Sequence, residues 1–147
     1  MIAAAVLLLL QPTGFSRGDG RVPSEAARVV LEKAISDDSP EMVLCIQIDG
    51  ADPSAALIRA LHRPDRTVVP ASTCHIADDA DHPTYYLATH APAVLLSVSE
   101  TRRASPTSIE VKAARFYHIK NGEFCTARLS KVSGHWKLVS LEQCEEL

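Results

Sequence analysis

Apolar positions along the first half of the chain follow two spacings, which predict a helix and a strand. After Ser24, five apolar residues recur at intervals of three and four, as on one face of a helix: Ala27, Val30, Leu31, Ala34 and Ile35. The mostly apolar run 42–48 lacks helical length and predicts a buried strand, which Asp49-Gly50 then ends. A short second helix is expected before Pro64, with Asp52 as its N-cap.

The second half of the chain shows the two-residue period of strands. Residues 94–98 alternate regularly, whereas in 109–116 the apolar phase changes, so a bulge is expected near Ala113-Ala114. Hairpin turns are predicted at Asn121-Gly122 and Ser133-Gly134. The remaining segments are an exposed loop at 75–83 and four expected strands at 67–69, 85–88, 124–129 and 136–141.

This order of elements predicts one α+β domain over residues 24–147. The leading helix, the late run of strands and the closing hairpin Ser133-Gly134-His135-Trp136-Lys137-Leu138 resemble the NTF2-like and cystatin-like rolls of small exported bacterial proteins. The resemblance implies an N-terminal helix packed on a curved, mainly antiparallel sheet. It does not imply a function, because one fold supports many functions.

The N-terminus has the pattern of a signal peptide. Residues 2–10 are uninterrupted apolar positions, too few to span a bilayer, and the small residues Gly14 and Ser16 favour cleavage after residue 16. No Lys or Arg precedes the apolar run, which is atypical for a signal peptide. Residues 1–16 are therefore expected to be removed and 17–23 to form a linker; the alternative is a short buried N-terminal helix or strand.

The four cysteines predict two disulfides. They form no Cys-x-x-Cys pair, which argues against zinc-ribbon and thioredoxin sites. A turn at Ser133-Gly134 brings Cys125 and Cys144 to one face of a hairpin, which leaves Cys45 for Cys74. Disulfides persist in oxidising compartments, so a secreted or periplasmic protein is expected. The alternative is four reduced, buried cysteines in a cytosolic protein.

Composition narrows the classes of function. The 147 residues are 46% hydrophobic and 22% charged, as in an ordinary folded domain, and the net charge is −3. The chain lacks the basic surface that nucleic-acid binding needs and an apolar segment long enough for an integral membrane protein. Gly14-Phe15-Ser16-Arg17-Gly18 and Arg17-Gly18-Asp19 match a nucleophile elbow and an integrin-type tripeptide by letters only, because the flanking strand, helix or closed loop is missing.

One segment concentrates chemistry-bearing side chains. It does not fit a calcium loop, and zinc could use only two of its histidines, so no metal or other cofactor is expected. Tyrosines beside charged groups are typical of contact surfaces. The alternative is a solvated acidic loop beside an edge strand. The candidate contact surface consists of His75, Asp78, Asp79, Asp81, His82, Tyr85, Tyr86 and His90.

The sequence leaves more than one function open. An exported, non-catalytic accessory or binding domain, with a protein or a small ligand as its partner, fits best. An NTF2-like enzyme for a small apolar substrate would need an internal acid or base, for which the candidates are Arg115, Tyr117, His118 and Glu142. A cystatin-type protease inhibitor ranks last, because the Gln-x-Val-x-Gly hairpin and the Pro-Trp pair are missing.

Overall fold

The computed structural model describes residues 20–147, without the side chains of residues 100 and 101. The predictions for residues 1–16 and the two motifs at residues 14–19 lie outside this part of the chain. Strands make up 50% of the structure and helices 19%. The elements are α1 (Ser24–Asp37), β1 (Val43–Ile48), α2 (Ala55–Leu61), β2 (Val68–Pro70), the 3-10 helix η1 (Ala71–Thr73), β3 (Cys74–His75), β4 (Tyr85–Tyr86), β5 (Ala93–Ser105), β6 (Ser108–His118), β7 (Asn121–Val132) and β8 (His135–Glu146).

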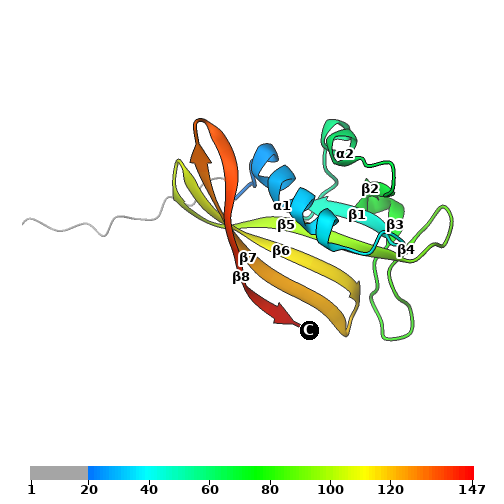
Figure 1. The fold of residues 1–147 in the computed structure, drawn as a ribbon. Coiled ribbons are helices and arrows are strands. Elements are labelled where there is room, and N and C mark those ends of the chain that lie inside the picture. The colour runs from blue at the N-terminus through cyan, green and yellow to red at the C-terminus, as the bar shows by residue number, and fades with distance from the viewer. Residues whose placement is uncertain (1–19) are drawn as a thin grey trace, which may run out of the picture.

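Six of the strands form one mixed sheet in the order β2-β1-β5-β6-β7-β8. Strand β1 runs parallel to both of its neighbours, β2 and β5, and the strands from β5 to β8 form an antiparallel meander. β3 and β4 form a separate two-stranded ribbon. Figure 1 shows a strongly twisted sheet with α1 across one face, and the green loops around β3 and β4 projecting beyond its end.

The main core lies between α1 and the sheet. Leu31 and Ile35 of α1 pack in one cluster with apolar residues from the strands, and Trp136 of β8 closes it. β1 is buried on both faces, because Leu44 and Ile46 belong to this core while Val43 and Cys45 belong to a second, smaller cluster. This double burial explains the continuous apolar run of β1. No helix among the described residues has the length and apolarity needed to cross a membrane.

The expected roll, a helix on a curved and mainly antiparallel sheet, is wrong. The structure is a strand-dominated mixed sheet with two short helices. β1 and β2, which the roll would place with the helical half, add a parallel edge to the meander. Periodicity marks a strand and its buried face, but it does not reveal which distant strand pairs with it, and this choice decides the architecture.

Two details of the predicted meander are also wrong. β6 pairs with β5 without interruption through Ala113 and Ala114, and the irregularity lies instead between Phe116 and His118. The turn after β6 occupies residues 119–120, so the Asn-Gly pair belongs to β7. Position 122 has no room for a side chain, because a Cβ on Gly122 would lie 3.1 Å from the Phe116 ring and 3.3 Å from a backbone oxygen. The turn at residues 133–134, in contrast, is confirmed.

The beginning of α2 differs from the prediction as well. Its N-cap is Ser54, whose hydroxyl accepts a hydrogen bond from the Leu57 N–H at 3.2 Å. The Asp52 carboxylate instead accepts a hydrogen bond from the backbone N–H of Ser72 at 2.9 Å. A carboxylate that accepts from a distant loop is no longer available to cap its own helix.

Candidate functional site

Both expected disulfides, Cys45–Cys74 and Cys125–Cys144, are present. Cys45 is completely buried in β1, and Cys74 begins β3. The first disulfide therefore fastens the β3–β4 ribbon to β1, the second strand from one edge of the main sheet. The candidate contact surface, residues 75–90, starts directly after this covalent link, which limits how far its first residues can move.

Polar contacts hold the rest of the segment. Thr84 is fully buried, and its hydroxyl accepts a hydrogen bond from the Ala77 N–H at 3.1 Å. The Thr84 N–H donates to the carbonyl of Tyr117 in β6, 2.9 Å away. His118 donates from Nε2 to the Ala80 carbonyl at 2.6 Å. The loop is thus attached to β6 at two places, although its own residues are mostly exposed.

Three of the predicted residues form a stack of rings. Tyr85 lies between the imidazoles of His75 and His90, with ring centroids 4.9 and 5.2 Å apart and interplanar angles of 28° and 16°. His90 adopts a positive φ of 59°, and its N–H donates to the Tyr86 carbonyl at 2.8 Å. The turn after β4 therefore folds back and places the His90 ring on Tyr85. Stacked rings present a large contact area that loses little side-chain entropy on binding.

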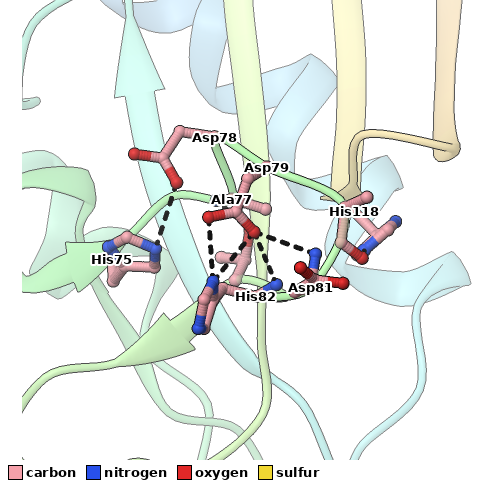
Figure 2. A network of polar contacts seen from close by, with 9 residues as sticks. His75, Ala77, Asp78, Asp79, Asp81, His82 and His118 are labelled. Carbon is pink, nitrogen blue, oxygen red and sulfur yellow. Dashed lines mark hydrogen bonds and ion pairs between the residues drawn. The ribbon is translucent and has the colours of Figure 1, made fainter.

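Two of the three aspartates, Asp78 and Asp79, pair with histidines of the same loop, as Figure 2 shows. His75 Nε2 lies 3.8 Å from Asp78 Oδ1, and His82 Nδ1 lies 2.8 Å from the Asp79 carboxylate. Asp79 also accepts hydrogen bonds from the N–H groups of Asp81 and His82. The His82 hydrogen bond lowers the pKa of Asp79, and the Asp79 carboxylate raises the pKa of His82.

Not every predicted residue faces the solvent. The Tyr86 side chain packs against the small inner cluster of Val43, Cys45, Cys74 and Ala93. Replacing it would weaken the core that supports the loop. Asp78, in contrast, is 75% exposed. The exposed candidates therefore consist of the ring stack and the acidic tip.

The loop carboxylates and imidazoles do not converge on a metal ion. Within the part of the chain that the structure describes, Glu123, Cys125 and Cys144 are the one group of three potential ligands whose ligand atoms lie within 4.8 Å of one another. Both sulfurs of this group are in a disulfide and cannot bind metal as thiolates.

The four candidate acid or base residues are dispersed. His118 holds the loop tip, and Tyr117 packs against the main core. Glu142, expected on the face of Trp136, lies on the opposite face, where it pairs with Arg128 at 3.4 Å. That expectation is wrong because β8 carries an irregularity between Leu138 and Ser140, which reverses the alternation of its side chains.

Arg115 alone of these four lines the pocket of about 360 Å³ beside the end of α1. There it forms an ion pair with Asp38, the residue that directly follows α1. Asp38 is 7% exposed. A carboxylate just after an amphipathic helix is expected to lie in solvent. Only its distant partner, Arg115 on β6, makes the burial of Asp38 favourable. The sequence alone thus held no signal for this pair.

Comparison with protein-family models, with curated proteins and with solved structures finds no match to this chain.

Proposed function

We propose that this protein is an exported, non-catalytic binding domain that contacts a protein partner through the segment 75–90. The stack of His75, Tyr85 and His90 is the observation that carries this proposal. A plain connecting loop has no need for three stacked rings near solvent, whereas contact surfaces favour rigid aromatic groups. The disulfide at Cys74 fixes the base of the loop, as a binding surface requires.

The charge of the loop indicates the chemistry of the partner. Its three aspartates give it a net negative charge when its histidines are neutral, and Asp78 is largely exposed. A partner with a basic patch would meet complementary charge at the tip and aromatic surface at the ring stack. Two disulfides suit a domain that works in an oxidising compartment.

Site-specific photo-crosslinking in the producing cells tests the proposal. A photoreactive residue at position 87, where Leu87 is exposed directly after β4, is expected to trap one protein, whereas the same group at Val139, an exposed residue of the edge strand β8, is not. Tyr85→Ala should abolish the crosslink, because the ring stack loses its central member. Asp78→Asn should weaken it if the partner is basic.

The control for folding is the thermal midpoint of each variant, which should stay near that of the wild type because these side chains are outside the main core. Tyr86 is left unchanged, since it supports the inner cluster. An equal crosslink at positions 87 and 139, or one that survives Tyr85→Ala, would show that this loop is not the contact surface.

A further inference from the structure

The pocket beside the end of α1 combines an apolar floor with charged side chains of both signs. Ala34, Leu96 and Leu141 contribute apolar surface, and Asp38, Arg115 and Glu123 contribute the polar side. Its volume of about 360 Å³ is within the range of small-ligand sites. The pocket is formed by different residues from the segment 75–90, so it does not belong to the contact surface proposed above.

Arg115 is held in one orientation. Its Nε and Nη2 donate to the two oxygens of Asp38 at 2.7 and 3.0 Å, a fork of parallel hydrogen bonds. The Asp38 side chain is only 1% exposed. If the guanidinium moved away, a buried carboxylate would lose its charged partner, which is unfavourable. Two of the five N–H donors are used in this way, and the other three have no acceptor among the described residues. The side chain of Arg115 is 41% exposed, which leaves these donors accessible to a ligand.

Glu123 places a negative charge in the pocket, opposite in sign to that of Arg115. It lies directly across from Arg115 in the antiparallel pairing of β6 and β7, which places both side chains on one face. Its Oε1 is 3.0 Å from Sγ of Cys125, but that sulfur is in a disulfide and has no hydrogen to donate. No cationic side chain of the described residues lies within 4 Å of this carboxylate.

The charges therefore add up to a preference for a cation. Asp38 and Arg115 neutralise each other, and Asp37, at the rim, is paired with Lys33. The half-buried Glu123 also faces Arg115, but at more than 4 Å, and because Arg115 is already paired with Asp38 the pocket keeps one excess negative charge beside its apolar floor. An ammonium group would supply the missing charge, while a neighbouring acceptor such as a carbonyl would satisfy the free donors of Arg115.

We propose that this pocket binds an apolar α-amino amide, which is the chemistry of the N-terminal residue of a peptide with an apolar side chain. The ammonium group binds Glu123, the carbonyl oxygen accepts from Arg115, and the side chain rests on Leu96 and Leu141. A free carboxylate in place of the amide is disfavoured, because it would lie beside Asp38 and Glu123.

A series of ligands with one isobutyl body tests each contact on the unaltered protein, followed by chemical shifts of its backbone amides. Leucinamide, which has all three groups, is expected to bind and to shift the amides of residues 113–115 and 123–125. Removing the ammonium group (4-methylpentanamide) or the carbonyl (3-methylbutylamine) should each weaken binding roughly tenfold, because each removes one charge-assisted hydrogen bond.

A pair of substitutions locates the ammonium contact. Glu123→Gln keeps the shape of the side chain and should weaken leucinamide roughly tenfold while leaving 4-methylpentanamide unchanged. Glu142→Gln, on the opposite face of the sheet, is the matched control and should change neither affinity. The proposal is overturned if leucinamide does not bind, if its shifts map outside the pocket, if the two truncated ligands bind as well as leucinamide, or if Glu123→Gln binds it like the wild type. The ligand series decides the matter even if Glu123→Gln does not fold.

Discussion

Removing the Cys45–Cys74 disulfide should lower stability and loosen the candidate contact surface at the same time. The two cysteines are 29 residues apart, and the entropy of closing such a loop in the unfolded chain corresponds to about 3.6 kcal/mol at 25 °C. The same relation gives about 3.2 kcal/mol for Cys125–Cys144, whose separation is 19 residues. The two losses are nearly equal, so stability alone does not distinguish the bridges.

Their local effects should differ. Cys45–Cys74 joins β1 to the ribbon that carries the ring stack, whereas Cys125–Cys144 joins two neighbouring strands, β7 and β8. In the Cys45→Ala/Cys74→Ala variant, amide hydrogen exchange should accelerate across residues 75–90. In the matched Cys125→Ala/Cys144→Ala variant, exchange in that segment should remain as in the wild type.

Urea unfolding without reductant measures the loss of stability in each variant. With a slope of about 1.5 kcal/mol per molar urea, either loss lowers the midpoint by about 2 M. A lowering of the urea midpoint by less than about 0.5 M in Cys45→Ala/Cys74→Ala would refute the entropic reasoning. Unchanged exchange in residues 75–90 of that variant would refute the claim that this bridge holds the loop.

Three further outcomes follow from single contacts. Arg66→Met should leave the thermal midpoint unchanged or raise it, since Nε and Nη1 of Arg66 are buried without a hydrogen-bond partner; a fall of more than about 5 °C would contradict this. Glu110→Gln should destabilise by less than about 1 kcal/mol and reduce the salt dependence of unfolding, because this carboxylate lies between two arginines on neighbouring strands. His82 should titrate above the ordinary histidine range in an NMR titration and return to that range in Asp79→Asn. Both partners are charged only between the lowered pKa of Asp79 and the raised pKa of His82. The ion pair is therefore lost when the pH falls below the pKa of Asp79 or rises above the pKa of His82.

Local patterns predicted the elements well, because their causes lie within a few residues. The helical stripe around Leu31, the buried run of β1 and the alternation at residues 94–98 all appear in the structure. The strand from residue 93 continues to Ser105, however, far beyond its apolar part. Backbone pairing with β6 holds this polar extension, and such pairing leaves no trace in the hydrophobic pattern.

The functional features were likewise predictable where their cause is local and not predictable where it depends on distant strands. The clustering of His75, Tyr85 and His90 was visible as composition, but their stacking depends on the positive φ of His90 and on the ribbon of β3 and β4. The pocket was not predictable, since Asp38 and Arg115 are far apart in sequence and meet only because α1 ends above β6. Long-range pairs of this kind require the topology before they can be recognised.

The parallel pairing of β1 with β5 sets the order in which the chain can fold during synthesis. The hairpins from β5 to β8 close between neighbours in sequence, whereas β1 emerges early and finds its partner only after β5 has followed. Until then β1 has only β2 beside it, and its other edge lacks a partner strand, while Cys125 and Cys144 meet within one hairpin. A nascent chain that stops before residue 93 should therefore expose the edge of β1 that β5 later covers, and an uncovered apolar edge can pair with another chain until the C-terminal half is complete.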